Sequence, residues 1–360
     1  MNKDYNAVIY YAVIDEYEIV DDGDNTKIVA RFDGLLAEDT ISYGAKSLDS
    51  INTHFLTVDG LPVEYQKLCD TSNFAWVEIA VTRCEGGNVS IITNVGSEEN
   101  YGNLQNISAL HRDHAEELNL EYTLSHPSFK SCMVEIDKIK EVIEKNTAIK
   151  QADALFIHYV GQGSAATLNN SKKYTSYSYT PECYFDVGGD IYRRGGSECL
   201  SKLYHTKLND DAFIILSHWD LDHWISAHKY EELQKLSWIA PFQKIGPTHA
   251  KMANKIKKND KLFLWCDDIG DSVLTKNLCI YKLENNNNRN YSGLCTVLKS
   301  PSTNILIPGD APYDRCGKII NKHIVNIVIV PHHGGKSRNG FNLSKFNLND
   351  VKLAISLKEY

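Results

Sequence analysis

Short apolar runs separated by turn sequences fill the first 105 or so residues of the chain. These runs are rich in Val, Ile, Tyr and Phe, which favour strands, and polar turns such as D-D-G-D at residues 21–24 interrupt them. The predicted strands are residues 7–20, 27–36, 53–58, 74–82 and 89–93. Two helical periodicities follow, at residues 108–118 and 133–145. Together these elements predict a strand-rich α+β module over residues 1–150, of a role that the sequence does not specify.

From about residue 151 the apolar strands end in residues that suit a metal site. Residues 153–160 form a predicted strand before a glycine turn, and residues 183–187 form another, with Asp186 at its tip. The glycines at 161 and 163 have neither of the spacings of nucleotide-binding loops, so we interpret them as a hairpin turn. A carboxylate such as Asp186 could cap a turn or support metal ligands from behind, and we favour the supporting role.

The densest group of possible ligands follows the predicted strand 213–216. His218, Asp220, Asp222 and His223 lie within six consecutive residues. Two imidazoles and two carboxylates suit zinc, and also manganese or iron, better than calcium, which prefers oxygen ligands. The alternative is a polar helix start, with the aspartates near the positive end of the helix dipole and the histidines on the surface. Four potential ligands so close to a buried strand favour the metal site.

Two later strands end in the same kinds of residue. The predicted strand 305–307 leads to Asp310, and the predicted strand 324–330 leads to His332 and His333. A capping role in a turn would explain Asp310 alone. It does not explain why three separate apolar strands are each followed by potential metal ligands. The recurrence predicts one site, built from all three strand ends, that can hold one or two divalent metal ions.

Composition limits the classes of protein that need consideration. The chain of 360 residues is 42% hydrophobic and 23% charged, as expected of a folded protein, and its formal net charge of −8 argues against non-specific coating of nucleic acid. Nine cysteines without a C-x-x-C pair indicate reduced thiols. We find neither a secretory signal nor an apolar run of the length, about 18 residues, that spans a bilayer. These features predict a cytoplasmic protein without a membrane segment.

Other candidate features are weaker. His111 and His114 share a helix face in the predicted helix 108–118, but no third ligand accompanies them in the sequence. The lysine-rich stretch 244–261 could line a groove for an anionic substrate or be solvated surface. The sequence K-S-R at 336–338 could hold a phosphate oxygen or belong to an exposed loop.

The order of these motifs resembles the metallo-β-lactamase fold, and most closely the lactamase-like domain of ComEC-type competence proteins and their soluble relatives. The matching motifs are V-G-Q-G at 160–163, D-V-G at 186–188, the cluster at 218–223, a strand led by N-x-x-S near 290–298, G-D at 309–310 and P-H-H-G at 331–334. The resemblance covers residues 151–356 and does not extend to residues 1–150. It implies an αββα sandwich in a domain of residues 151–360, after the N-terminal module.

The resemblance also implies roles for individual residues. His218 and Asp220 would hold one metal ion, Asp222 and His223 the other, and Asp310 would bridge or flank them. One of the two histidines of P-H-H-G would complete the shell. Asp220 stands where most of the superfamily has histidine, and this added oxygen ligand leaves manganese as the alternative to zinc.

The chain departs from the family pattern at three places. The family commonly has aspartates on either side of V-G-Q-G, where this chain has Tyr159 and Ser164. Relatives continue past the last strand to a further histidine, whereas here the predicted strand 351–357 is followed by the last residue, Tyr360. We expect that the site is completed differently, that only one metal ion binds tightly, or that the chain is truncated.

The leading functional hypothesis is a metal-dependent hydrolase that cleaves a phosphodiester, in nucleic acid or a nucleotide, with a metal-activated water. Its predicted catalytic residues are Asp222, His223 and Asp310. The alternatives are hydrolysis of a small ester, lactone or amide, and a binding module without turnover. The N-terminal module could restrict access of substrates or bind a protein partner.

Overall fold

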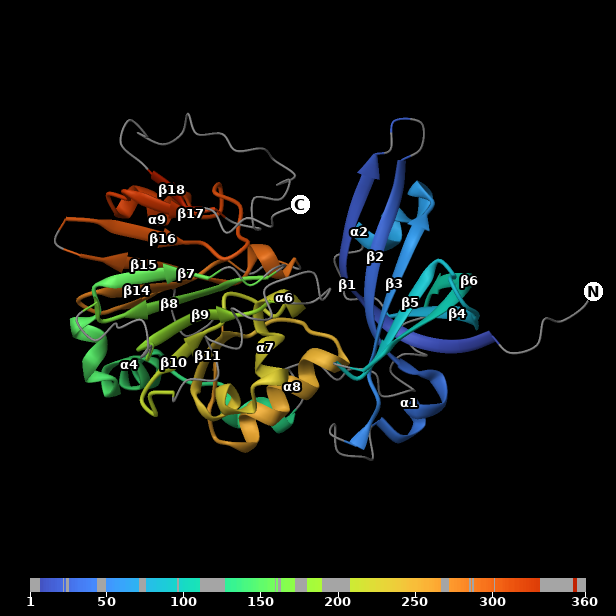
Figure 1. The fold of residues 1–360 in the computed structure, drawn as a ribbon, viewed down its shortest axis with the longest axis horizontal. Coiled ribbons are helices and arrows are strands. Elements are labelled where there is room, and N and C mark those ends of the chain that lie inside the picture. The colour runs from blue at the N-terminus through green and yellow to red at the C-terminus, as the bar shows by residue number, and fades with distance from the viewer. Residues whose placement is uncertain are drawn as a thin grey trace, which may run out of the picture. The chain divides into compact units, whose positions relative to one another are not determined.

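The computed structural model describes most of the chain. The described residues are 7–21, 23, 26–43, 50–70, 76–95, 97–110, 127–158, 160, 163–171, 180–189, 208–266, 272–284, 286, 288–300, 302–330 and 352–354. The chain forms two compact units (Figure 1). The first consists of residues 1–129 and 244–255, and the second of residues 130–243 and 256–360. The division into functional domains at residue 150 stays a prediction.

The first unit contains a closed barrel of six strands, drawn in blue to cyan in Figure 1. Around the barrel the order is β1-β2-β3-β5-β6-β4, and every neighbouring pair is antiparallel. The strands are β1 (Ala7–Asp21), β2 (Thr26–Leu36), β3 (His54–Leu61), β4 (Val77–Arg83), β5 (Val89–Thr93) and β6 (Glu99–Ala109). The described residues of this unit also form the short α-helices α1 (Ala37–Tyr43) and α2 (Gln66–Asp70). Alternate side chains such as Ile28, Phe32 and Val58 fill the barrel core.

Five of the six barrel strands are predicted from the sequence, and the sixth is not. Residues 108 and 109 were expected to begin a helix, but Ser108 and Ala109 pair with Glu78 and Val77 as the end of β6, so that prediction is wrong there. Most side chains of β6 are exposed and polar, so the strand lacks the apolar alternation that identifies a strand from sequence. Pairing with neighbouring strands decides its structure instead. The remainder of the predicted helix, with His111 and His114, lies outside the described residues.

Residues 244–255 complete the first unit by supplying the start of helix α8 (Pro247–Lys258). The Asp33 carboxylate accepts hydrogen bonds from the Thr248 amide at 3.0 and 2.9 Å and from its hydroxyl at 2.5 Å, so it caps the helix from β2. A Cβ atom on Gly246 would lie 2.2 Å from Asp33 Oδ2, so glycine makes room for this cap. Beside it, His249 Nε2 lies 2.7 Å from Asp15 Oδ1.

The second unit contains two six-stranded sheets. One has the order β12-β11-β10-β9-β8-β7 and the other β13-β14-β15-β16-β17-β18, drawn respectively in green to yellow and in orange to red (Figure 1). The strands of the first sheet are β7 (Ala154–Ile157), β8 (Ala165–Asn169), β9 (Cys183–Val187), β10 (Phe213–Ile215), β11 (Ser237–Pro241) and β12 (Leu262–Trp265). Those of the second are β13 (Ser272–Leu274), β14 (Leu278–Lys282), β15 (Leu294–Lys299), β16 (Asn304–Ile307), β17 (Ile327–Ile329) and β18 (Lys352–Ala354).

One hydrophobic core joins the two sheets of the second unit. Phe185 and Ile215 of the first sheet belong to the same buried cluster as Ile280 and Leu294 of the second. Helix α4 (Ile136–Lys145) packs into this core, and helix α9 (Gly317–Lys322) packs through Ile319 on a separate cluster formed by the other face of the second sheet. The described part of the unit is therefore a mixed α+β fold with two sheets and few helices, and the complete αββα order stays a prediction.

The other helices that the structure describes in the second unit are short. The stretch 225–235 is divided between α7 (Ser226–Lys229) and a 3₁₀ helix (Glu231–Lys235). The lysine-rich stretch 244–261 contains all of α8, and the ammonium of Lys251 donates hydrogen bonds to the Ile51 carbonyl and the Asn94 side chain. Lys251 therefore has a structural role. Among the helices that the structure describes, none has the length and apolar character to cross a membrane.

Candidate metal centre

The proposed ligands begin where strand β10 ends. This strand is fully buried and pairs in parallel with β9 and β11, so the chain leaves it at the same edge as β9. Residues 217–220 then lead into helix α6 (Leu221–Trp224). Asp220 precedes the helix, but its side chain makes no capping hydrogen bond. Both His218 and His223 are buried, with 1% and 0% of their surface exposed, so a polar helix start with surface histidines does not describe this segment.

Three of the predicted ligands lie together. His218, His223 and Asp310 each place one ligand atom within 4.8 Å of those of the other two. The Asp310 carboxylate reaches this group from the turn after β16, where its Oδ2 lies 3.4 Å from His223 Nε2 and 3.9 Å from His218 Nε2. The two imidazole rings are 4.0 Å apart between centroids. The ends of β10 and β16, from different sheets, therefore meet at one cluster of two nitrogen ligands and one oxygen ligand.

Asp186, at the end of β9, supports this cluster from behind. One of its oxygens accepts a hydrogen bond from the Ser217 amide at 2.7 Å, and the other lies 2.8 Å from both the Ser217 hydroxyl and His223 Nδ1. These contacts fix the His223 ring and direct its Nε2 toward Asp310. Asp186 adopts a left-handed backbone conformation with a φ of 55°, a strain that the three contacts offset.

Two glycines permit the close approach of the segments around the cluster. A Cβ atom on Gly188 would lie 1.6 Å from the Asp222 carbonyl oxygen, so no larger residue fits there without movement of the backbone. Gly309, with a φ of 61°, lies against Ser217, and a Cβ atom there would approach the Ser217 Cβ to 2.6 Å. The glycines of the G-D and D-V-G motifs are therefore explained by close packing, in addition to the chemical role of the neighbouring aspartates.

The cluster carries an excess of negative charge. Burial alone would lower the pKa of His223, but the carboxylates of Asp310, Asp222 and Asp186 together raise that pKa well above its ordinary value. Carboxylates that hold a proton on a buried imidazole also attract a metal cation to the same place. His218 Nε2 is buried and forms no hydrogen bond with any residue that the structure describes. These donors fit a divalent ion of the zinc type.

The other two aspartates of the cluster have different surroundings. Asp222 is 14% exposed at its side chain, and its Oδ1 lies 3.7 Å from His223 Nε2. Asp220 is more deeply buried, with Oδ2 3.1 Å from His218 Nε2 and Oδ1 2.7 Å from the guanidinium of Arg289. Sequence reasoning missed Arg289, because nothing in its polar, asparagine-rich surroundings marks it as a site residue.

Several predicted site residues lie outside the described part of the chain. They are His332 and His333 of P-H-H-G and the K-S-R sequence at 336–338; Tyr159, which departs from the family pattern, also lies outside it. Of V-G-Q-G, Val160 is buried and Gly163 lies close to the Asp222 carbonyl oxygen. Ser164, where the family has aspartate, donates its amide hydrogen bond to the Asp222 carbonyl at 3.0 Å. It therefore contacts the cluster through its backbone.

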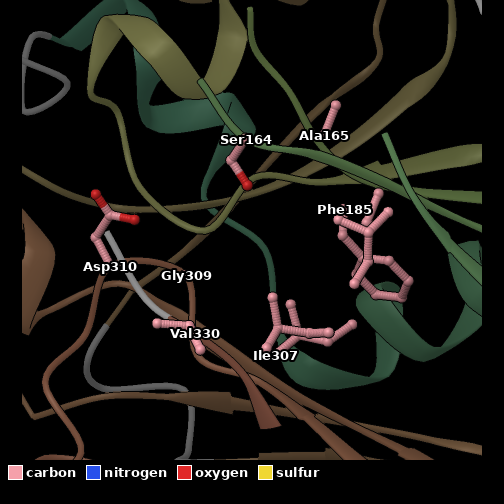
Figure 2. Close-up of a pocket in the computed structure, with 10 residues that line it drawn as sticks. Ser164, Ala165, Phe185, Ile307, Gly309, Asp310 and Val330 are labelled. Atoms are coloured by element: carbon pink, nitrogen blue, oxygen red, sulfur yellow. The ribbon is translucent and has the colours of Figure 1, made fainter. Parts of the chain in front are cut away.

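A small cavity of about 30 Å³ lies beside the cluster, enough for about one water molecule. Asp310 lies at one side and Phe185 at the opposite side (Figure 2). Apart from Ser164, Gly309 and Asp310, its lining residues are apolar, including Ile307 and Val330. The cavity therefore joins a carboxylate of the candidate centre to the apolar space between the sheets.

Comparison with known proteins gives similarity only at the level of structure. No known family description and no curated protein matches the sequence. Similar solved structures include Tm1679, described as a metal-dependent hydrolase of the β-lactamase superfamily (12% identity, 55% of this chain and 85% of that chain, TM-score 0.32). A second is a possible metal-dependent hydrolase from Veillonella parvula, with 12% identity over 57% of this chain and 86% of that chain and a TM-score of 0.34. A third is the metallo-β-lactamase fold protein YhfI from Bacillus subtilis, with 11% identity over 56% of this chain and 96% of that chain and a TM-score of 0.31. A particular closeness to ComEC-type proteins stays a prediction.

Proposed function

We propose that this chain is a metal-dependent hydrolase with its centre at His218, His223 and Asp310. The observation that carries the proposal is the buried grouping of these three side chains, with their ligand atoms within 4.8 Å of one another. Three protein ligands are the usual number at a catalytic zinc site, where one coordination position stays open. Zinc is the ion proposed, with manganese as the alternative because a carboxylate is among the ligands.

The surrounding residues have separable roles in this proposal. Asp186 holds the His223 ring through Nδ1, and the Ser217 hydroxyl lies 3.0 Å from His218 Nδ1, so both rings present Nε2 to the centre. A divalent ion there would supply Lewis acidity, which polarises the substrate and acidifies water. Asp222 is the more exposed carboxylate beside this centre, and it is placed to accept a proton and orient the attacking water.

The proposed substrate is a phosphodiester in nucleic acid or a nucleotide. Its support is the arrangement of motifs that resembles ComEC-type proteins, together with the requirement of phosphoryl transfer for a cation that offsets charge on the phosphate oxygens. The second candidate is a small ester, lactone or amide. The apolar residues beside Asp310, such as Ile307 and Val330, favour it, because they suit a neutral carbonyl substrate better than a charged phosphate.

Metal analysis and a substrate comparison test the proposal together. Protein purified without chelator is expected to contain zinc or manganese, and to cleave labelled DNA, labelled RNA or bis(p-nitrophenyl) phosphate faster than p-nitrophenyl acetate. Replacing His218 with Ala removes a ligand, so we expect metal affinity to fall at least 100-fold and hydrolysis to fall with it. The matched control is His323→Ala, since His323 pairs with Tyr281 away from the centre.

Each remaining outcome identifies a different function. Faster cleavage of the acetate ester would favour the second candidate. Stoichiometric metal without cleavage of any of these substrates would identify a binding module without turnover. Protein that binds neither ion under any tested condition would refute the metal centre itself.

A further inference from the structure

A buried arginine forms an ion pair with one of the candidate ligands. The Arg289 Nε lies 2.7 Å from Asp220 Oδ1, and both side chains are almost completely buried, with 6% and 8% of their surface exposed. Arg289 begins a 3₁₀ helix (Arg289–Tyr291) just before β15, far in sequence from the cluster at 218–223. A guanidinium is permanently charged, so this pair puts a fixed positive charge directly on Asp220.

Gln243 holds the two partners in place. Its side-chain amide donates a hydrogen bond to the Arg289 carbonyl at 2.8 Å, and its side-chain oxygen accepts one from the Trp219 amide, next to Asp220, at 3.2 Å. The same amide also donates to the Ser292 hydroxyl at 3.0 Å. The buried side chain of Gln243 thus connects the backbone at Arg289 to the backbone beside Asp220. These hydrogen bonds hold the two partners of the ion pair in place.

The pair changes what Asp220 can offer a metal ion. Oδ1 already contacts the guanidinium, and Oδ2 lies 3.1 Å from His218 Nε2. A second divalent ion at Asp220 would lie within a few ångströms of the guanidinium, where two positive charges repel strongly in a buried setting. The three-residue group of His218, His223 and Asp310, in contrast, does not depend on Asp220.

We propose that Arg289 is a positioning residue that takes the place of a second cation at Asp220, so that the centre holds a single divalent ion through His218, His223 and Asp310. The inference rests on the proposed metal-dependent function and adds the number of ions to it. In this arrangement Asp220 balances the charge of Arg289 and is not a metal ligand.

The number of bound ions, measured separately with Zn²⁺ and with Mn²⁺, tests this inference. Equilibrium dialysis followed by elemental analysis, with titration calorimetry for affinity, is expected to give one tight ion for the unmodified chain. Replacing Arg289 with Gln removes the charge and keeps a hydrogen-bond donor, so a second ion is expected to bind at least about tenfold more tightly than it binds to the unmodified chain. Arg289→Lys restores the charge and is expected to bind one ion.

A double variant separates this electrostatic role from a purely structural one. Asp220→Asn combined with Arg289→Gln removes the carboxylate as well as the guanidinium, so it is expected to bind one ion again. Circular dichroism of each metal-free variant checks that it is folded. Two tight ions in the unmodified chain, or one ion in a folded Arg289→Gln variant, would overturn the inference while leaving the metal-dependent function intact. Absence of any bound ion in the unmodified chain would instead overturn both.

Discussion

At the scale of single residues, Asp186 is constrained both in its backbone and in its side chain. It combines a left-handed backbone conformation with contacts to Ser217 and His223. Residues other than glycine rarely adopt this conformation, although aspartate and asparagine tolerate it better than most. An asparagine at this site therefore keeps the backbone and removes the negative charge.

The variant Asp186→Asn is expected to weaken metal binding 10- to 100-fold, as is typical when the support of a ligating histidine is lost. The affinity is expected to fall because a charged acceptor no longer holds the His223 ring at Nδ1. Competition with a chromophoric chelator measures the affinity. Asp211→Asn, at an exposed site, is the matched control. An Asp186→Asn variant with unchanged affinity would show that the carboxylate does not support the ligand.

The residues of the centre differ in how far sequence alone could indicate them. His218, His223 and Asp310 follow buried strands, and the supporting role of Asp186 was favoured for the same reason. Arg289 gave no such signal, because its pairing with Asp220 joins two loops that are distant in sequence. Side chains that act through long-range ion pairs have no local periodicity or spacing by which they can be recognised.

At the scale of secondary-structure elements, the start of helix α8 depends on a carboxylate from another element. Burial raises the pKa of Asp33 to about 6, although the nearby charge of His249 and the hydrogen bonds from Thr248 oppose the rise. Asp15 lies nearby and adds to the increase. The folded chain therefore retains a proton on Asp33 at pH values where the unfolded chain has lost it.

This difference makes the stability contributed by Asp33 dependent on pH. Because the folded pKa is above the ordinary value of 3.8, the contribution is largest below pH 4 and decreases as the pH rises through 6. Relative to Asp33→Asn, the free energy of unfolding of the unmodified chain is expected to fall by about 2.4 kcal/mol between pH 4 and pH 7. Urea unfolding of both proteins across this range measures the effect. A constant difference between them would contradict it.

Strands and helices are easier to predict from the sequence when their side chains are uniformly buried. Strands with uniformly buried side chains, such as β9 and β10, have sequences that identify them, and β9 has the predicted bounds. The stretch 225–235 contains enough apolar residues to suggest one helix, but the chain is interrupted at Tyr230, whose φ and ψ of −114° and 82° are not helical. Packing of Leu233 and Trp238 in the interior decides this geometry, and a sequence pattern does not report it.

At the scale of the whole molecule, the chain passes between the two units three times, near residues 129, 243 and 255. The first unit is therefore not a continuous segment. Its buried network includes Asp15, Asp33 and Arg31 from the barrel, together with Thr248 and His249 from α8. The lysine-rich stretch was interpreted as a groove or surface because no local feature shows that its start completes a barrel unit formed by residues more than a hundred positions earlier.

A fragment of residues 1–129 is expected to lack a stable barrel. It would leave Asp15 and Asp33 without their partners on α8, and a buried charge that loses its partner typically costs about 3 to 5 kcal/mol, a large share of a domain's stability. Thermal unfolding monitored by circular dichroism compares the fragment with the complete chain. A fragment that unfolds cooperatively, at the temperature of the barrel in the complete chain, would show that residues 244–255 are dispensable.

The passage of residues 244–255 into the first unit also sets an order of events during synthesis. Although the barrel strands are all made by residue 109, the segment that completes their unit emerges only after most of the second unit's first sheet. At about 5 to 20 residues per second, the interval between residues 129 and 255 lasts about 6 to 25 seconds. During that time the nascent barrel carries ionisable groups in its wall without their final partners. Ribosome-associated chaperones that cover such groups would act on this chain during that interval.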